Sequence, residues 1–326
     1  MKETYSQPQK LIDYISYGWN LGNYLDAHDK KFVLSDCYAK PLEYATALWG
    51  NPVFRLETID LLKAHNCNCI RIPVTWCNFV NIKNNNVAIS AEALAHIKEI
   101  IDYALSKEFV VILDMHHDDQ TWLKISCTTK EFENICKLYS KIWDIIAYEF
   151  KDYTSNLIFE GMNEVIDRSN PEKHDWWGKD KSCFRKLNKL YKVFIKTARK
   201  HSEHNQNRTL MISTYGAQIH QNALKYFKLP KDKNIIVDIH HYSRNTDIDS
   251  YIEQYKYVLE YFVSKNIPII LGEIGEKKDS VGNADILKAY TSFAQKYNLK
   301  YILWDNGTSR AYIDRKTNTI IRSLNF

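Results

Sequence analysis

The chain has 326 residues, of which 45% are hydrophobic and 25% are charged, and its formal net charge is +5. This composition is ample for a sizeable core and ordinary for a soluble protein. The small basic excess is scattered among acidic residues, so we interpret it as solvated surface and expect no nucleic-acid partner.

Short apolar runs that end in polar residues recur along the chain and predict eight strands. We place them near Tyr17–Leu21, Cys69–Ile72, Val110–Met115, Leu157–Gly161, Thr209–Ser213, Ile236–Ile239, Ile269–Leu271 and Tyr301–Trp304. Helical patterns lie between them, at Arg55–Ala64, Ala91–Lys107, Thr129–Phe150, Phe184–His201, Ser250–Lys265 and Asn283–Tyr297. In one of these, the apolar residues follow the spacing of a helix with one buried face: Leu94, Ile97, Ile100, Ile101, Ala104 and Leu105.

Strands that alternate with helices are expected to lie parallel, because the crossover between parallel strands needs a covering helix. Eight such units in about 300 residues match an α/β protein of the (β/α)8 TIM-barrel class. A doubly wound open sheet is the alternative, but no Gly-x-Gly-x-x-Gly or Walker-type loop opens a helix here. No low-complexity linker divides the chain, so residues 1–326 are predicted to form a single domain.

Two glutamates, Glu164 and Glu273, each follow a short apolar run that is typical of a buried strand. A carboxylate at such a position is partly desolvated, so its pKa can be tuned and its geometry fixed. The active site of a (β/α)8 barrel forms at the C-terminal ends of the strands, where both side chains would lie. Hydrolysis of a glycosidic bond needs such a pair, one as proton donor and one as nucleophile or base.

Other predicted strand ends also carry charged, hydrogen-bonding or aromatic side chains. These are Arg71, His116, His117, Asn163, His240, His241, Tyr242, Trp304, Asp305 and Asn306. Each of them alone could be a loop residue without a role. Strand ends that all deliver such groups favour a functional site over a purely structural explanation.

The seven cysteines cannot all pair with one another. Cys67 and Cys69 stand beside His65, but no Cys-x-x-Cys occurs, and a structural zinc site would need better spacing. We therefore expect free, mostly buried thiols and no metal site, as suits a reducing compartment or an anaerobic habitat.

Seven motifs follow one another along the chain. They are Gly18-Trp19-Asn20-Leu21-Gly22-Asn23-Tyr24-Leu25-Asp26-Ala27, Trp49-Gly50-Asn51-Pro52, Ile70-Arg71-Ile72-Pro73-Val74-Thr75-Trp76, Asp114-Met115-His116-His117-Asp118, Phe159-Glu160-Gly161-Met162-Asn163-Glu164, Leu271-Gly272-Glu273-Ile274-Gly275 and Trp304-Asp305-Asn306-Gly307. In this order they resemble the motifs of bacterial endoglucanases of glycoside hydrolase family 5. The resemblance implies a (β/α)8 barrel, retaining hydrolysis of β-linked glucans or related polysaccharides, and no cofactor.

The resemblance also implies roles for individual residues. Glu164 corresponds to the general acid/base and Glu273 to the nucleophile, which Arg71 would keep ionised by lowering its pKa. Tyr242 would hydrogen-bond Glu273, and His240 would lie near enough to Glu164 to affect its protonation. The remaining substrate-binding residues would be Asn163 on the sugar 2-hydroxyl, Trp304 as a stacking floor, and His116, His117, Asn23 and Asn306.

Some positions depart from the family pattern and leave the preferred polymer open. Val165 follows Glu164 where many relatives carry proline, and His241 stands where a small residue is common. The following Ser243-Arg244-Asn245 also departs from the usual loop. Several aromatic residues are either stacking platforms along a cleft or packing residues: Trp49, Trp76, Trp122, Trp176, Trp177 and Tyr215.

The expected function is an endo-acting β-1,4-glucanase for cellulose-like chains, mixed-linkage β-glucan or xyloglucan, working as a monomer. A β-mannanase or an exo-acting β-glucosidase of the same family is the alternative. A barrel that only binds glycans is disfavoured because both glutamates are present. A metal-dependent hydrolase that uses His116, His117 and His240 is disfavoured by the expected pairing of Arg71 with Glu273.

The location in the cell is left open. The first residues, from Met1 to Pro8, contain no apolar segment of the kind a signal peptide requires, and no apolar run is long enough to span a membrane. A polymeric substrate favours export after removal of a leader. The absent leader and the odd number of thiols favour the cytoplasm.

Overall fold

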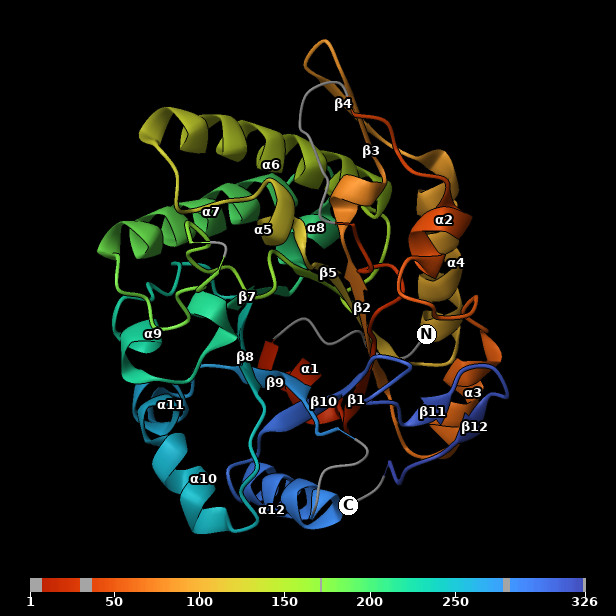
Figure 1. The fold of residues 1–326 in the computed structure, drawn as a ribbon, viewed down its shortest axis with the longest axis vertical. Coiled ribbons are helices and arrows are strands. Elements are labelled where there is room, and N and C mark those ends of the chain that lie inside the picture. Colours follow the sequence, from red (N-terminus) through yellow and green to blue (C-terminus); the bar gives the residue numbers. More distant parts are fainter. Residues whose placement is uncertain (1–7, 30–36, 171, 278–281, 325–326) are drawn as a thin grey trace.

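A computed structural model describes residues 8–29, 37–170, 172–277 and 282–324. Eight parallel strands close into a barrel in the order β1-β10-β9-β8-β7-β6-β5-β2, with helices around it (Figure 1). The strands are β1 (Gly18–Leu21), β2 (Cys69–Val74), β5 (Val110–Met115), β6 (Leu157–Glu160), β7 (Leu210–Ser213), β8 (Ile235–His241), β9 (Ile269–Ile274) and β10 (Lys300–Asp305). The predicted (β/α)8 barrel is therefore confirmed.

Each predicted strand is present, but β2, β8 and β9 continue further toward their C-terminal ends than their apolar runs suggested. Strand β8, for example, was predicted to end at Ile239 and continues to His241. Polar residues such as His240 stay in the ladder because the barrel interior at this end is itself polar. An apolar run therefore marks only the lower part of these strands.

Long helices cover the outside of the barrel close to where they were predicted. They are α3 (Glu57–Ala64), α4 (Ala91–Ser106), α6 (Thr129–Glu149), α7 (Lys181–Ala198) and α12 (Asn283–Lys296). Helix α6 begins at a capping box, in which Thr128 Oγ1 accepts from the Glu131 amide and Glu131 Oε2 accepts from the Thr128 amide. The helix predicted over Ser250–Lys265 is instead three pieces, α10 (Ile248–Gln254), α11 (Lys256–Tyr261) and the 3-10 turn η3 (Val263–Lys265).

Several short elements were not predicted. The helices are α1 (Pro8–Tyr14), α2 (Leu42–Ala47), α5 (Asp118–Thr121), α8 (Glu203–Asn207) and α9 (Gln221–Lys225), with 3-10 turns η1 (Trp76–Asn78) and η2 (Tyr215–Ala217). The hairpins are β3 (Val80–Lys83) with β4 (Asn86–Ile89), and β11 (Ile313–Asp314) with β12 (Thr319–Ile320). In the described residues the second hairpin follows β10, so the eighth unit departs from the strand-then-helix pattern. Asn84 and Asn85 form the first hairpin's turn at φ 51° and 64°, a conformation that asparagine tolerates.

The interior of the barrel has an apolar layer below a polar one. The lower layer consists of Cys69, Val110, Ile112, Ile158, Met211, Ile236, Ile270 and Ile302, and it packs against Leu11, Ile12 and Ile15 at helix α1. Alternate residues of a strand face the same side, so the residues two positions further along also point inward. They include Arg71, Asp114, Glu160 and Asp238, all of which are fully buried. This polar layer supports the C-terminal end of the barrel.

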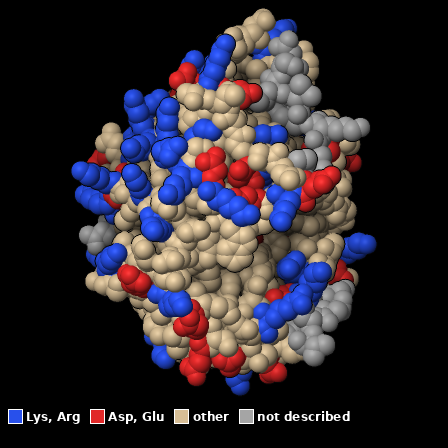
Figure 2. All heavy atoms as spheres, turned by 60° about the vertical axis from the view of Figure 1, so that its left-hand side comes forward, with Lys and Arg blue, Asp and Glu red and all other residues tan. Residues whose placement is uncertain are grey.

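The surface and the cysteines largely follow the sequence expectations. All seven cysteines are free thiols, as predicted. No helix among the described residues combines the length and the apolar character needed to cross a bilayer. Basic residues are less evenly mixed with acidic ones than expected, because an exposed stripe on α7 consists of Lys181, Arg185, Lys189, Lys192 and Lys196. Figure 2 shows basic side chains gathered on one part of the face that it presents.

Candidate active site

A buried arginine lies at the centre of the polar layer. Arg71 on β2 donates to both carboxylate oxygens of Glu160 on β6, from Nε and from a terminal nitrogen, each at 2.7 Å. Its terminal nitrogens also donate to Asp114 Oδ2 and to Glu273 Oε1, each at 2.9 Å. The predicted contact between Arg71 and Glu273 is therefore present, but the guanidinium is shared among three carboxyl groups.

Two asparagines complete the surroundings of Arg71. The side-chain oxygen of Asn20 accepts from the guanidinium at 3.0 Å, and that of Asn163 accepts at 2.8 Å. The amide nitrogen of Asn20 in turn donates to the carbonyl of Gly272, directly before Glu273. Asn163 is thereby held in one orientation at the end of β6, with its amide nitrogen 3.4 Å from Nε2 of His116.

Glu273 points into the barrel because of a bulge in β9. Toward β8 the register passes from the pair Ile239–Leu271 to the pair His240–Glu273, so β9 contains one extra residue, Gly272. A strict alternation would aim Glu273 outward, since Ile270 faces the interior and Leu271 the helices. The extra residue reverses that direction and turns the carboxylate inward.

Gly272 is the residue that this bulge requires. A Cβ at that position would lie 2.0 Å from Oδ1 of Asp238, which accepts a hydrogen bond from the Gly272 amide at 3.0 Å. Any side chain there would displace the Asp238 carboxylate. The close approach of backbone and carboxylate thus fixes the strand segment that carries Glu273.

The pKa of Glu273 does not follow the expectation drawn from Arg71 alone. Glu273 is 4% exposed, and this burial raises its pKa, whereas His240, Arg71 and a hydrogen bond from Tyr242 lower it. The Tyr242 hydroxyl donates to Glu273 Oε2 at 2.6 Å, as the resemblance implied. The net direction of the pKa shift is upward because burial is the largest of these effects and the nearby charge of Glu164 adds to it. Burial likewise raises the pKa of Glu160, to about 7.

His240 on β8 links the two glutamates. Its Nδ1 lies 2.8 Å from Glu164 Oε1 and 3.6 Å from Glu273 Oε2, while Nε2 lies 2.8 Å from Asp238 Oδ2. Burial lowers the pKa of His240, but Glu273, Asp238 and Glu164 raise it, and the result is a pKa well above the usual value. The surrounding carboxylates therefore favour the positively charged form of His240.

The catalytic candidates Glu164 and Glu273 face one space. One carboxylate oxygen of each, together with a ring nitrogen of His240, lie within 4.8 Å of one another. Glu164 follows β6 in a loop, and its side chain is 22% exposed, whereas that of Glu273 is 5% exposed. One carboxyl group thus lies at the surface of the cleft and the other at its base.

Trp304 and the two histidines after β5 line the same space. The rings of Trp304 and His116 stack at 5.4 Å with an angle of 7° between their planes. His116 Nδ1 lies 2.6 Å from Asp114 Oδ2, which fixes the ring. The His117 ring contacts the His116 ring at a centroid distance of 4.3 Å and also lies beside Trp49 at 5.6 Å.

Other predicted residues lie at the rim or in the core. Asn306 Oδ1 accepts from the amides of Thr308 and Arg310, so this side chain organises its own loop. Asn23 adopts a positive φ of 60°, and its carbonyl accepts from Asn51. Among the six candidate stacking residues, three are buried and therefore pack in the core, namely Trp76, Trp122 and Tyr215. Trp177 is 65% exposed, and Trp49 and Trp176 are partly exposed.

The carboxylates that hold the charged groups in place were not predicted as site residues. Asp114, Glu160 and Asp238 are all fully buried and all contact Arg71 or His240. The sequence could have indicated them, since each is a charged residue inside an otherwise apolar run that was predicted to form a strand. Asp26 belongs to the first of the seven motifs but was not predicted as a site residue. It lies beside His116 and His117.

Comparison with known proteins identifies the family. The family model described as cellulase (glycosyl hydrolase family 5) matches residues 25–310. Endoglucanase A of Clostridium longisporum is 31% identical over 316 residues, which cover 91% of this chain and 59% of that protein. The chain thus spans about three fifths of that relative.

Solved structures agree with this result. A GH5-4 broad specificity endoglucanase from Ruminococcus champanellensis with bound cellotriose has a TM-score of 0.88 at 27% identity, covering 98% of this chain and 96% of that one. A xyloglucan-specific endo-β-1,4-glucanase from a metagenomic library, in complex with cellotriose, has a TM-score of 0.85 at 29% identity, with coverages of 97% and 96%. The chain described here belongs to the cellulase family, glycosyl hydrolase family 5.

Proposed function

We propose that this chain is a retaining endo-β-1,4-glucanase that hydrolyses cellulose-like, mixed-linkage or xyloglucan chains by a double displacement. The observation that carries the proposal is the position of Glu164 and Glu273, whose facing oxygens lie within 4.8 Å of each other. Retaining enzymes place their carboxyl groups about 5–5.5 Å apart, whereas inverting enzymes need about 6.5–9.5 Å to admit a water. The limit of 4.8 Å refers to the nearest oxygens and not to the centres of the two carboxyl groups. This close approach of the oxygens favours direct attack by one carboxylate.

Glu273 is the proposed nucleophile. Its carboxylate is oriented by Arg71 on one oxygen and by the Tyr242 hydroxyl on the other. It attacks the anomeric carbon and forms a glycosyl-enzyme intermediate, which water then hydrolyses. Arg71 and His240 lower the pKa of Glu273 against the larger effect of burial, and they favour the ionised form that the attack needs.

Glu164 is the proposed acid/base. It protonates the leaving oxygen in the first step and takes a proton from water in the second. Its greater exposure suits a group that must exchange protons with solvent between the two steps. Asn163, held by Arg71, is placed to hydrogen-bond the sugar 2-hydroxyl, and Trp304, stacked on His116, forms the floor for that sugar.

The proposed substrate class draws on two features. Related structures bind cellotriose, and one relative is specific for xyloglucan. In this chain, Trp177 is exposed on the loop that carries Glu164, and its ring lies 4.9 Å from that of His220. An exposed aromatic ring on this loop suits stacking against a sugar of the substrate. We further propose that the chain forms one catalytic domain and acts as a monomer.

A panel of polysaccharides tests this function. Carboxymethyl cellulose, mixed-linkage β-glucan, xyloglucan and β-mannan are incubated with the enzyme, and reducing ends and product sizes are measured over time. We expect early release of oligosaccharides of several lengths from at least one of the β-1,4-glucans. Release of glucose alone from chain ends would indicate exo action, and activity only on mannan would indicate a mannanase.

The Glu164→Gln variant is expected to separate substrates by their leaving groups. For polysaccharide, kcat/KM should fall by about 10²–10⁴-fold, because protonation of the leaving oxygen is lost. For an aryl cellobioside with a strongly acidic phenol, kcat/KM should stay nearly unchanged, because that first step needs little protonation. The matched control is Glu172→Gln, an exposed residue of the same loop, which should behave as the wild type. Equal losses on both substrates would contradict the acid role of Glu164.

A further inference from the structure

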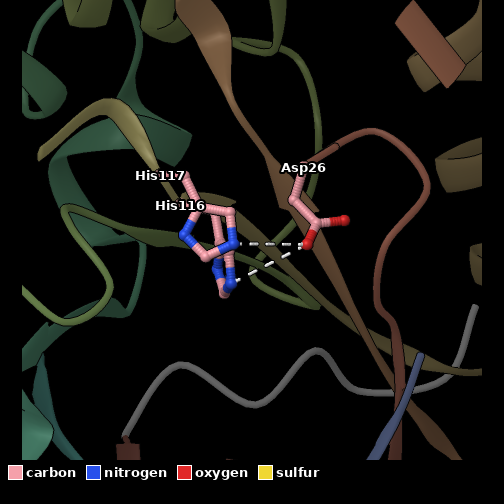
Figure 3. Close-up of side chains that lie close together, drawn as sticks. All are labelled: Asp26, His116 and His117. Carbon is pink, nitrogen blue, oxygen red and sulfur yellow. Dashed lines mark ion pairs between the residues drawn. The ribbon is translucent and has the colours of Figure 1, made fainter. Parts of the chain in front are cut away.

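Three side chains with metal-binding atoms face one another beside the catalytic pair (Figure 3). Asp26 follows β1, and His116 and His117 follow β5. Asp26 Oδ2 lies 3.7 Å from Nε2 of His117 and 3.9 Å from Nε2 of His116. The three ligand atoms all lie within 4.8 Å of one another. None of the roles proposed for catalysis uses this convergence.

Asp26 supplies the observation that points to a bound cation. Its side chain is fully buried, and Oδ1 accepts from the Tyr24 amide at 2.9 Å. Within the part of the chain that the structure describes, Oδ2 has no hydrogen-bond partner. A buried carboxylate oxygen without a partner is destabilising, and burial raises the pKa of Asp26 to about 7. This oxygen is aimed at the two imidazole nitrogens.

His116 is arranged as a metal ligand usually is. Its Nδ1 bonds to the buried carboxylate of Asp114 at 2.6 Å, so the proton lies on Nδ1 and the lone pair on Nε2. Histidines that bind metals commonly donate their second ring nitrogen to a carboxylate in this way. The contact of Nε2 with the Asn163 amide is long, at 3.4 Å, and a metal ion would outcompete it.

His117 can present its Nε2 in the same manner. Its Nδ1 lies 2.9 Å from the terminal amide of Gln120, an exposed side chain that can turn over to offer its oxygen instead. The proton then lies on Nδ1 and the lone pair on Nε2. Burial lowers the pKa of His116 and of His117.

Hydrogen bonds to the end of β2 and the residue after it hold the three residues in place. The Thr75 hydroxyl donates to the carbonyl of Asp26 at 2.8 Å and accepts from the amide of His117 at 3.3 Å. The amide of His116 donates to the carbonyl of Val74 at 2.8 Å. The two segments that carry the ligands are thus joined through one residue of the intervening strand end.

We propose that Asp26, His116 and His117 form a site for a divalent transition metal, with Zn²⁺ the best match to two imidazoles and one carboxylate. Tetrahedral Zn²⁺ with bonds of about 2.0–2.1 Å holds its ligand atoms roughly 3.3 Å apart. The two separations from Asp26, 3.7 Å and 3.9 Å, need to close by roughly half an ångström, and the two ring nitrogens lie within 4.8 Å of each other. A fourth position remains for water.

A second cluster, Glu164, His240 and Glu273, does not suit a metal as well. Both ring nitrogens of His240 lie 2.8 Å from carboxylate oxygens, those of Glu164 and Asp238. The imidazolium has no lone pair to give, because each nitrogen carries a proton. A metal ion is therefore expected at Asp26 rather than between the glutamates.

Metal at this site inhibits hydrolysis, an inference that rests on the proposed function. His116 Nε2 lies 3.9 Å from Glu273 Oε1, and its ring stacks on Trp304. An ion bound to Nε2 would occupy space next to Glu273. Its positive charge would attract the Glu273 carboxylate and make that group a weaker nucleophile. Zn²⁺ and glucan are thus expected to compete.

Calorimetric titration of the full chain with ZnCl2 tests the site without reference to activity. We expect one Zn²⁺ per chain, with about 100-fold weaker binding for Asp26→Asn and for His117→Ala, since the loss of an outer-shell partner alone typically costs 10–100-fold. The matched control is His201→Ala, a surface histidine that faces a single carboxylate, Asp144, at 3.1 Å. The thermal midpoint of each variant establishes that it is folded.

Two results would overturn the proposal. One is the absence of Zn²⁺ binding by the folded wild type; the other is wild-type affinity in both Asp26→Asn and His117→Ala. Weaker binding in Glu164→Gln alone would place the ion at the glutamates and would also contradict it. Competition is measured separately, as a rise in the KM for glucan with Zn²⁺ that EDTA reverses. An enzyme without glucanase activity that still binds one Zn²⁺ would refute the function and leave the metal site standing.

Discussion

Replacing Glu273 by alanine is expected to abolish turnover of polysaccharide, with kcat reduced by about 10⁵-fold or more, because loss of a nucleophile in a comparable covalent mechanism costs about 10⁶-fold. Sodium azide should restore part of the activity toward an activated aryl cellobioside. The vacated space lies against the Arg71 guanidinium, 2.9 Å from the lost carboxylate oxygen, so it attracts a small anion. The product should be the glycosyl azide of inverted configuration, identified by nuclear magnetic resonance.

The matched control is Glu164→Ala under the same conditions. There Glu273 still forms the glycosyl-enzyme, and azide attacks it from the side that water uses, so two inversions yield an azide of retained configuration. The two variants therefore give opposite anomers if the roles are assigned correctly. A retained azide from Glu273→Ala, or activity unchanged in that variant, would exclude Glu273 as the nucleophile.

Replacing Arg71 by methionine is expected to have the largest effect on stability. The guanidinium is fully buried and pairs with Glu160, Asp114 and Glu273. Removal of one partner from a buried ionic network costs about 3–5 kcal/mol, because the remaining charges stay buried without compensation. Denaturant unfolding measures the loss, and polysaccharide hydrolysis should disappear with it.

The pH dependence of this loss has a defined sign. Burial already raises the pKa of Glu160 to about 7 beside Arg71, and removal of the arginine raises it further. A carboxyl group whose folded pKa lies above its unfolded pKa destabilises the fold increasingly as pH rises through that interval. Below about pH 7 Glu160 is protonated in both folded proteins, so the deficit of Arg71→Met relative to the wild type should grow as the pH rises above about 7.

The control for this variant is Arg55→Met. Arg55 lies 3.8 Å from Glu57, and the side chains are 48% and 66% exposed, so its loss should change the free energy of unfolding by about 0–1 kcal/mol. A loss below about 1 kcal/mol in Arg71→Met, or no change of the deficit with pH, would mean that the network is not held by charge.

The barrel could be predicted because an apolar strand run recurs eight times along the sequence, with helical patterns between the runs. Each apolar run lies where the interior is apolar, so runs such as Val110–Met115 were located to the residue. Where the interior becomes polar, the runs stop before the strands do, as at Ile239 in β8. Short helices and hairpins were missed because their stability comes from tertiary contacts, for example from α1 packing beneath the barrel.

The convergence of Glu164 and Glu273, the proposed catalytic pair, could also be predicted, because each follows an apolar strand run in the sequence. The direction of the pKa shift of Glu273 could not be predicted, since it depends on how deeply the side chain is buried and on its distances to His240, Arg71 and Glu164. Nor could the sequence show which aromatic residues are exposed: Trp76 is fully buried and Trp177 is 65% exposed. These properties come from distances between strands, which a linear pattern does not contain.

Because of the bulge at Gly272, the direction of the proposed nucleophile does not depend on the sequence of the loops at the rim of the barrel. Glu273 takes its direction from the backbone of β9 and from the carboxylate of Asp238 below it, both of which belong to the barrel wall. The residues after His241, which depart most from the family pattern, lie beyond that wall. Their sequence can therefore be exchanged between relatives to alter polymer choice while the reacting carboxylate keeps its orientation, provided that Gly272, Asp238 and Tyr242 are retained.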